Sequence, residues 1–314
     1  MTTVIDIRGL QKRFGRVQAL DGLDLEVGEG EVHGFLGPNG AGKTTTIRVL
    51  LGLIRASGGT AEVFGRSPWG KAAALHERIA YVPGDVALWP NLSGGEIIDL
   101  LARLRGADTG TGDYKARRAR LVDAFQFDPR KKAGTYSKGN RQKVSLIAAF
   151  AVPASLYILD EPTSGLDPVM EAVFSEEVST IAKNDGSSIL LSSHILSEVE
   201  ALCDRVTIIR AGRAVESGTL ADLRHLTRTE VSFVSDGIDE ASVRALAGVH
   251  DVAVASDRYH FTVDSADVSA LLPGLGALSV QSLTITPPSL EELFLRHYGD
   301  EITAANDDLE PVAR

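Results

Sequence analysis

A glycine-rich run of nine residues, GPNGAGKTT from Gly37 to Thr45, has the spacing of a loop that holds phosphate groups. It matches the pattern G-x-x-x-x-G-K-[ST], in which backbone N–H groups face the phosphates of a nucleotide. Its glycines at 37, 40 and 42 allow the backbone to curl so that successive amides point inward. The run therefore predicts binding of ATP or GTP.

The flanking segments predict the strand and the helix that this loop joins. Glu31 to Leu36 has the pattern of a buried strand, and Thr44 to Leu53 has the period of a helix. The positive end of the helix dipole would face the phosphate oxygens. We expect Lys43 to reach the β- and γ-phosphates and the Thr44 hydroxyl to hold Mg²⁺. A plain glycine-rich turn before a core helix is the alternative.

A second apolar run, Ser155 to Glu161 (SLYILDE), ends in two carboxylates. As a strand beside the phosphate-loop strand, it would deliver Asp160 and Glu161 into the same site. We assign Asp160 to the metal and Glu161 to the base that accepts a proton from the attacking water. By itself, the pair is equally consistent with two acids that end a strand before Pro162.

Three further segments surround these carboxylates in a fixed order. Tyr136 to Val144 reads YSKGNRQKV, Ser164 to Asp167 reads SGLD, and His194 follows the next apolar strand, Ser188 to Leu191. In this order the sequence resembles the ATP-binding-cassette family. Members of that family carry a phosphate loop, an LSGGQ-type signature, an acidic strand end, a D-loop and a switch histidine.

Two runs compete for the signature position. In the family the signature serine lies 23 residues before the metal aspartate, and Ser137 has this spacing to Asp160. The run LSGGE around Ser93 is closer to the consensus, but it lies 67 residues before Asp160 and no RQ-x-V-like run follows it. We therefore place the signature at YSKGN. We interpret Ser93 as the N-cap of a helix from Glu96 to Arg105, with Glu96 completing a capping box.

The resemblance implies that each nucleotide is shared between two chains. The signature would begin a helix whose N-terminus faces the phosphate of ATP held by the opposite subunit, so that a homodimer or a paralogous partner is expected for turnover. Asp167 in the D-loop would lie across the interface between the two chains. His194 would contact the γ-phosphate or the attacking water, and a histidine that merely opens a helix from His194 to Leu202 is the alternative.

The resemblance implies ATP and Mg²⁺ as cofactors and a larger set of site residues. Phe14 stands where the family places an aromatic residue that stacks on adenine, and packing in an N-terminal β layer is the alternative. The expected catalytic residues are Glu161 and His194, and the expected metal ligands are Thr44 and Asp160. The expected nucleotide contacts are Phe14, Gly37, Pro38, Asn39, Gly40, Ala41, Gly42, Lys43, Thr44, Thr45, Ser137, Lys138, Gly139, Asn140 and Asp167.

One position departs from the family pattern. In Ile79 to Pro90 (IAYVPGDVALWP) the family has glutamine directly after the YVP-like strand, and this chain has Gly84. Because glycine offers no side chain to Mg²⁺ or water, either Asp85 or a water substitutes, or hydrolysis depends more on Glu161 and on a partner. We therefore expect slow ATP hydrolysis by the isolated chain.

Composition and hydropathy restrict the compartment and the partners. The longest apolar stretch, Val144 to Leu159, has 16 residues and is broken by Pro153, so it falls short of a membrane span. The family resemblance implies that a separate permease docks near Gly84 to Asn91, and packing of Trp89 beneath the helical insert is the alternative. A net charge of −10 argues against a nucleic-acid partner. The N-terminus lacks a signal core, which predicts a location at the cytoplasmic face of the cell membrane through the permease.

The element pattern predicts an α/β fold with two domains and a tail. We expect residues 1–226 to form a P-loop NTPase of the cassette type, with a mixed sheet core, an antiparallel β subdomain and a helical subdomain at about 93–152. Residues 227–298 read β-α-β-β-α-β and a closing helix, a small ferredoxin-like α+β domain. Residues 299–314 predict an acidic, disordered tail. The small domain resembles units on ATPase subunits of bacterial drug and antibiotic exporters (ABC-2 type), and dimer stabilisation and ligand sensing are both open uses.

Together these features predict the ATP-hydrolysing subunit of an ABC exporter. It would drive efflux of a drug, antibiotic or lipid-like substrate through the separate permease. A soluble cassette protein acting on ribosomes or nucleic acid is the alternative. Translational members of that kind usually carry two cassettes and repair members carry long coiled coils, and this sequence has neither.

Overall fold

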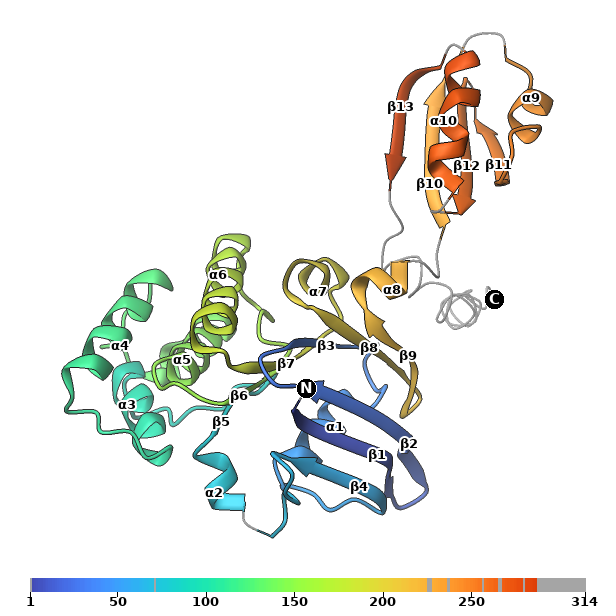
Figure 1. The fold of residues 1–314 in the computed structure, drawn as a ribbon. Coiled ribbons are helices and arrows are strands. Elements are labelled where there is room, and N and C mark those ends of the chain that lie inside the picture. The colour runs from blue at the N-terminus through green and yellow to red at the C-terminus, as the bar shows by residue number, and fades with distance from the viewer. Residues whose placement is uncertain are drawn as a thin grey trace, which may run out of the picture. The chain divides into compact units, whose positions relative to one another are not determined.

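The protein is described from a computed structural model that defines residues 2–70, 72–224, 228–235, 238–255, 257–264, 267–278 and 280–286. Two compact units divide the chain, Met1–Ser217 and Gly218–Arg314 (Figure 1). Leu226, the expected end of the ATPase domain, lies outside the described residues, as do the expected helix Ser289 to Tyr298 and the tail 299–314. The domain limits therefore stay predictions.

The centre of the first unit is a six-stranded sheet. It comprises β3 (Val32–Leu36), β5 (Ile79–Val82), β6 (Leu156–Asp160), β7 (Ser188–Ser193), β8 (Arg205–Arg210) and β9 (Arg213–Thr219). The strand order is β5-β6-β7-β3-β8-β9, and the pairs from β5 to β8 are parallel. The turn residues Ala211 and Gly212 both have positive φ, which suits the tight hairpin that adds β9. The sheet is therefore mixed, as predicted.

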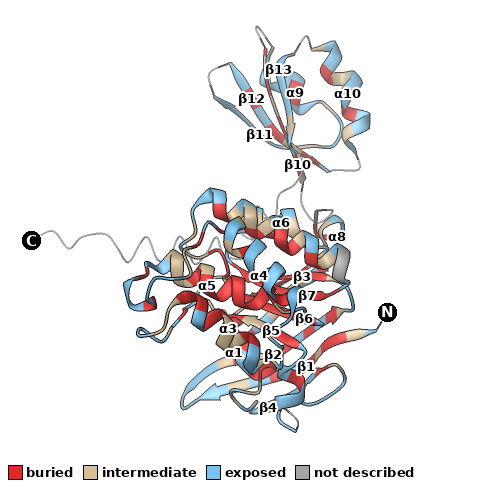
Figure 2. Cartoon of the chain, turned by 90° about the vertical axis from the view of Figure 1, so that its left-hand side faces the viewer, coloured by how far each residue is buried: buried red, intermediate tan, exposed pale blue. Residues whose placement is uncertain are grey.

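Strands β3, β6 and β7 are buried along their whole length, which Figure 2 shows in red. Such continuous apolar runs are typical of parallel strands covered on both faces. Phosphate loop, acidic pair and His194 all follow the carboxyl ends of these three strands. Because parallel strands end at the same edge, the sheet brings the three segments together.

A second, antiparallel sheet packs against the core through one helix. It comprises β1 (Thr3–Phe14), β2 (Val17–Gly28) and β4 (Gly58–Val63), in the order β2-β1-β4. Helix α1 (Lys43–Leu50) contacts β2, β4 and β6, so it lies between the two sheets. Ile5, Ile7 and Ile47 are fully buried in this shared core, and the area they remove from water favours the arrangement.

The remaining helices of the first unit flank the core sheet. Helices α3 (Gly94–Leu104), α4 (Gly112–Ala124) and α5 (Lys138–Phe150) contact one another, and α5 contacts β5 (Figure 1). The capping box of α3 is confirmed, since Ser93 and Glu96 exchange both hydrogen bonds. The other helices are α2 (Ala72–His76), the 3₁₀ turn Ala133–Thr135, α6 (Pro168–Asp185) and α7 (Leu196–Leu202). In the part of the chain that the structure describes, every helix is too short or too polar to cross a bilayer.

Two helix boundaries differ from the sequence-based expectation. The helix expected over Thr44 to Leu53 ends at Leu50, because Gly52 adopts a left-handed conformation with φ of 68°. The helix expected from His194 begins at Leu196, because the Ser193 hydroxyl accepts the N–H of Ile195 and holds this residue outside the helix. The first boundary is decided by the backbone conformation of a glycine and the second by a local hydrogen bond, rather than by the apolar period.

After the short helix α8 (Leu220–Arg224), the described residues of the second unit form a four-stranded antiparallel sheet with two further helices. It comprises β10 (Arg228–Val234), α9 (Glu240–Arg244), β11 (Val249–Ala255), β12 (Arg258–Asp264), α10 (Val268–Ala277) and β13 (Gln281–Thr286). The strand order β11-β12-β10-β13 places the first and third strands at the centre. Phe233, Phe261 and Leu271 lie in its own small core. This order is that of a ferredoxin-like sheet, as predicted.

Candidate active site

The phosphate loop joins β3 to α1, and its glycines are required by contacts with neighbouring backbone. A Cβ on Gly37 would lie 2.5 Å from the carbonyl oxygen of Ile209, and a Cβ on Gly42 would lie 2.9 Å from that of Ala19. Gly42 also has φ of 116° and Gly40 has φ of 84°. The loop is thus wedged between the two sheets in a shape that residues with side chains do not adopt. Asn39 and Gly40 form its exposed tip.

Lys43 lies folded over the loop that precedes it. Its ammonium donates to the carbonyl oxygens of Gly37 at 2.6 Å and Pro38 at 3.2 Å, and it lies 3.5 Å from Glu161 Oε1. Burial lowers the pKa of Lys43, while the neighbouring Glu161 and Asp160 raise it. The cation is therefore held at the place where the loop would present phosphate oxygens.

Thr44 and Asp160 come together as the sequence predicts for a metal site. The Thr44 hydroxyl donates to Asp160 Oδ2 at 3.0 Å. Asp160 is 3% exposed, and burial raises the pKa of its carboxyl group, an effect that the bond from Thr44 reduces. Within the described residues, the other oxygen, Oδ1, is buried without a hydrogen-bond partner in normal geometry. A buried carboxylate oxygen with spare capacity beside a threonine hydroxyl fits Mg²⁺, which prefers oxygen ligands and retains water and phosphate oxygens.

Glu161 occupies an unusual backbone conformation. Its φ is 47°, and its N–H donates to the carbonyl oxygen of Ser192 at 2.9 Å. Left-handed conformations cost free energy in residues with side chains and concentrate at functional sites. The carboxylate is directed between Lys43, with Nζ 3.5 Å from Oε1, and His194, with Nδ1 3.4 Å from Oε1. Its side chain is 25% exposed, so water can reach it.

His194 stands on the short turn between β7 and α7. Its side chain is 48% exposed, and its Nδ1 lies 3.4 Å from Glu161 Oε1. Since α7 begins only at Leu196, His194 does not open that helix. The geometry therefore places this histidine with the acidic pair, and its role as the switch stays a prediction.

The run YSKGN, the expected signature, begins α5 and packs against the segment that follows Glu161. Ser137 is the N-cap, and its hydroxyl accepts the N–H of Asn140 at 3.3 Å. The Lys138 ammonium donates to Ser164 Oγ at 2.7 Å, and a Cβ on Gly139 would lie 2.5 Å from the carbonyl oxygen of Gly165. The signature and the D-loop of one chain thus lie against each other.

Two further residues shape this junction. Gln142, which the sequence analysis did not single out, is buried and donates from Nε2 to the carbonyl oxygen of Pro162 at 2.8 Å. The sequence signal for this buried contact was a glutamine on the apolar face of a predicted helix. Asp167 is the N-cap of α6, where its Oδ1 accepts the N–H of Met170 at 3.0 Å. Its side chain is therefore engaged within its own chain in this structure.

Phe14 lies at the end of β1 and is 47% exposed. The Lys12 ammonium lies 4.8 Å from its ring centroid. This exposure is inconsistent with the alternative that Phe14 packs in the core of the β layer. Stacking on adenine stays a prediction.

Gly84 passes directly beside the acidic pair. A Cβ at this position would lie 3.1 Å from the carbonyl oxygen of Asp160 and 3.6 Å from Glu161 Cβ. The position is therefore close to the expected metal and base, but it contributes only backbone. The next residue, Asp85, is exposed.

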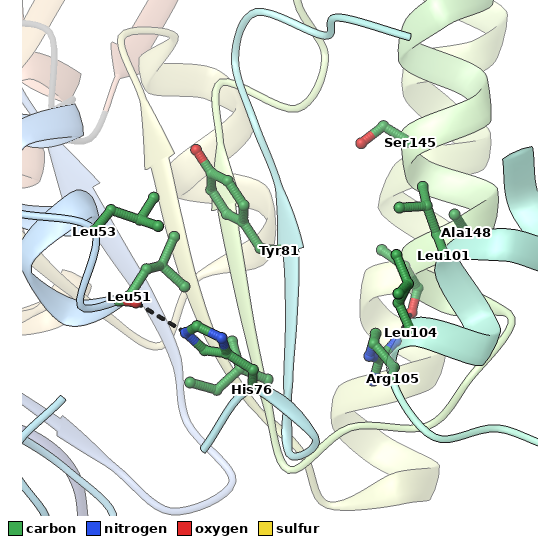
Figure 3. Close-up of a pocket in the computed structure, with 11 residues that line it drawn as sticks. Leu51, Leu53, His76, Tyr81, Leu101, Leu104, Arg105, Ser145 and Ala148 are labelled. Atoms are coloured by element: carbon green, nitrogen blue, oxygen red, sulfur yellow. Dashed lines mark hydrogen bonds between the residues drawn. The ribbon is translucent and has the colours of Figure 1, made fainter. Parts of the chain in front are cut away.

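A groove of about 350 Å³ lies between the sheet core and the helical group, and Figure 3 shows its lining. On one side lie Leu51, His76 and Tyr81, with His76 Nε2 bonded to the carbonyl oxygen of Leu51 at 2.8 Å. The other side is formed by Leu101, Leu104, Arg105, Ser145, Ala148 and Ala149. Strand β5 leads from the groove to Trp89, which is 49% exposed and so is not enclosed beneath the helical group.

Comparison with known proteins identifies this arrangement. A family model described as ABC transporter matches residues 20–164. A model described as ATP-binding protein DrrA1-3-like, C-terminal domain, matches residues 218–298. The daunorubicin resistance ATP-binding protein DrrA3 of Streptomyces coeruleorubidus is 35% identical over 310 residues, which cover 95% of this chain and 97% of that protein. The chain belongs to the ABC transporter family.

Other relatives and solved structures agree with this assignment to the ABC transporter family. The bacitracin transport ATP-binding protein BcrA of Bacillus licheniformis is 31% identical over 95% of this chain and 98% of that protein. A solved ATP-binding subunit of an ABC transporter is 31% identical, with a TM-score of 0.66 over 71% of this chain and 92% of that one. The cassette MJ0796, solved with ADP and phosphate, shares the fold at 20% identity, with a TM-score of 0.61 over 69% of this chain and 98% of that one.

As an ABC cassette, the chain binds and hydrolyses ATP, which confirms the predicted family, fold class and ATPase activity. Cassettes of this family dimerise and pair with membrane permeases. The roles of the individual site residues stay predictions, although the structure brings together Lys43, Thr44, Asp160, Glu161 and His194.

Proposed function

We propose that this chain lies at the cytoplasmic face of the membrane and powers the export of a drug, antibiotic or lipid-like molecule through a separate permease. The observation that supports this most strongly is similarity along nearly the whole chain, small domain included, to proteins named for resistance to daunorubicin and for transport of bacitracin. The match over residues 218–298 matters because this domain is additional to the cassette. It favours the exporter branch over a soluble cassette acting on ribosomes.

The proposed chemistry assigns one task to each side chain in the site. Thr44 and Asp160 would hold Mg²⁺, which neutralises charge on the phosphates. Lys43 would bind the β- and γ-phosphates, for which its position over the loop is suited. Glu161 would accept the proton of the attacking water, and His194, at 3.4 Å from this carboxylate, would orient that water or the γ-phosphate.

The proposed working unit is a homodimer with two shared nucleotide sites. The N-terminus of α5, capped by Ser137, would complete the phosphate site of a second copy. Because Lys138 and Gly139 pack on Ser164 and Gly165, movement of the signature would be transmitted to the D-loop and to Glu161. ATP would close the dimer, and loss of phosphate would reopen it.

The proposed contact with the permease is the groove of Figure 3 and the neighbouring segment 84–91. Its walls are largely apolar, and Leu53 and Leu104, which line it, expose 59% and 70% of their area. Trp89, in the neighbouring segment, exposes 49%. Such area is costly to leave in water, and a short amphipathic helix from the permease would cover it. One wall belongs to the sheet core and the other to the helical group. A permease helix bound between them would therefore couple their movement to the permease.

Affinity purification from solubilised membranes tests this function. We expect an integral membrane protein to accompany the tagged chain and to raise its ATP turnover by about tenfold, a change of about 1.4 kcal/mol in the barrier. The low basal rate follows from Gly84, which leaves the metal and the water without a glutamine side chain. Recovery of ribosomes or nucleic acid instead, or the same fast turnover with and without the membrane protein, would contradict the proposal.

A further inference from the structure

Glu198 is a partly buried acid that the chemistry above does not use. It lies in the first turn of α7, four residues after His194, and burial raises the pKa of its carboxyl group. Its Oε1 is enclosed and lacks a hydrogen-bond partner in normal geometry among the described residues. Enclosing a carboxylate costs free energy unless it makes compensating contacts, so its position calls for a specific role.

One oxygen of Glu198 holds the turn that carries His194. The Ser193 hydroxyl donates to Glu198 Oε2 at 2.6 Å, and the same hydroxyl oxygen accepts the N–H of Ile195 at 2.9 Å. Ser193 ends β7 and is 2% exposed. The two bonds fix the residues on both sides of His194, and they connect the strand end to the first turn of α7.

The carboxylate of Glu198 also faces the segment that follows Glu161. The Thr163 hydroxyl is close enough to lower the pKa of Glu198, and Thr163 is itself buried. A cavity of about 250 Å³, lined by Thr163, Glu171 and Glu198 among others, lies at this junction of α6 and α7. Glu198 therefore lies between the turn of His194 and the start of the D-loop segment.

We propose that Glu198 is a positioning residue that holds His194 against Glu161. The inference rests on the roles proposed above for these two residues. The Ser193 hydroxyl has one proton, which it donates to Glu198, and its lone pairs accept the N–H of Ile195. A neutral amide oxygen can accept that proton as a carboxylate does. What the turn requires is thus an acceptor at position 198, rather than a negative charge.

Steady-state hydrolysis by the full-length chain tests this link. Glu198→Ala should lower kcat by about tenfold or more while the KM for ATP changes by less than about twofold. Glu198→Gln keeps an acceptor for Ser193 and should retain most of the wild-type kcat. Ser197→Ala, a change at the exposed neighbouring residue, is the control and should leave kcat within about twofold of wild type.

The decisive measurement repeats Glu198→Ala in a His194→Ala background. If Glu198 acts through His194, the second substitution should add less than about a twofold loss. An undiminished loss in that background, or a Gln variant as slow as the Ala variant, overturns the proposal. If Glu198→Ala fails to fold, as judged by melting and by binding of a fluorescent ATP analogue, Ser193→Ala removes the same bond and must show the same dependence on His194. A wild-type chain without turnover would instead contradict the proposed function.

Discussion

Glu161 has a left-handed backbone conformation, which costs free energy in a residue with a side chain. Its left-handed φ of 47° turns the carboxylate away from the line of β6, toward Lys43 and His194. The hydrogen bond from its N–H to the carbonyl oxygen of Ser192 holds the residue there. A regular extension of the strand would direct the side chain elsewhere. The left-handed backbone is therefore part of how the carboxylate of Glu161, the proposed base, is placed.

Replacing Glu161 with glutamine removes the base and leaves the phosphate contacts. We expect Glu161→Gln to bind ATP with near wild-type affinity, to accumulate as a closed dimer and to lose about 10²- to 10⁴-fold in turnover. Phosphate release measures turnover, and size-exclusion chromatography with ATP measures the dimer. Full activity in this variant would show that another group activates the water.

Replacing Lys43 with alanine should act on binding instead. Hydrogen bonds to charged groups contribute about 1.5–3 kcal/mol, so Lys43→Ala should weaken ATP binding by about 10- to 100-fold. Titration with a fluorescent ATP analogue measures this. Unchanged affinity would place the ammonium away from the phosphates, in contrast to its position over Gly37 and Pro38.

The buried Asp160 gives the nucleotide-free cassette a pH dependence. Its folded pKa lies above that of the unfolded chain because burial disfavours the charged carboxylate. Its contribution to stability is thus complete below the unfolded pKa of about 3.9 and is lost as pH rises through the folded pKa. Asp160→Asn, which still accepts from Thr44, should melt at a higher temperature than wild type at pH 7. Melting curves without nucleotide should show this gain shrinking toward pH 4, and a gain independent of pH would refute the assignment.

At the scale of elements, two helices in the same region begin with a serine N-cap, and they are suited to different tasks. Ser93 on α3 and Ser137 on α5 each accept an N–H three residues ahead at 3.3 Å. The first run, LSGGE, is nearer to the signature consensus, yet Glu96 there bonds back to the N-cap N–H and completes a closed box. Ser137 has no acidic residue at that place and instead lies beside the D-loop contact of Lys138.

This pair provides a matched test of which run is the signature. Ser93→Ala and Ser137→Ala each remove an N-cap bond and should destabilise the fold by about 1 kcal/mol. Only Ser137→Ala should also lower ATP turnover, since only that serine would face a nucleotide. Chemical denaturation and steady-state hydrolysis of both variants measure the two effects. A larger loss of turnover in Ser93→Ala would reverse the assignment.

On the scale of the whole molecule, the proposed site is divided between two copies of the chain. Each chain would supply Lys43, Asp160 and Glu161 to one nucleotide site. The N-terminus of its α5 would complete the second site, to which the other copy supplies those three residues. Turnover per chain should therefore rise with protein concentration and level off once dimers dominate. Hydrolysis measured across a dilution series, alongside light scattering, checks this. A strictly monomeric preparation with full, concentration-independent turnover would contradict the shared site.

The sequence alone determined the order of the motifs and the class of the fold, because both depend on local signals. Gly37, Gly42 and Lys43 have fixed spacing within one loop, and apolar strands before Asp160 and His194 predict a parallel sheet edge. The β-α-β-β-α-β reading of the small domain depended on the same local patterns, and strand order confirmed it.

Only the tertiary structure decided which side chains share a bond. The proximity of His194 to the Glu161 carboxylate and the bond from Lys138 to Ser164 join segments that are distant in sequence. The positive φ of Glu161 likewise has no signal in the sequence. Glu198 reads in the sequence as one more acid on a short amphipathic helix. Its burial against Ser193 becomes visible only when β7, α6 and α7 pack, because desolvation and hydrogen-bond geometry depend on distances in space, and spacing along the chain does not specify those distances.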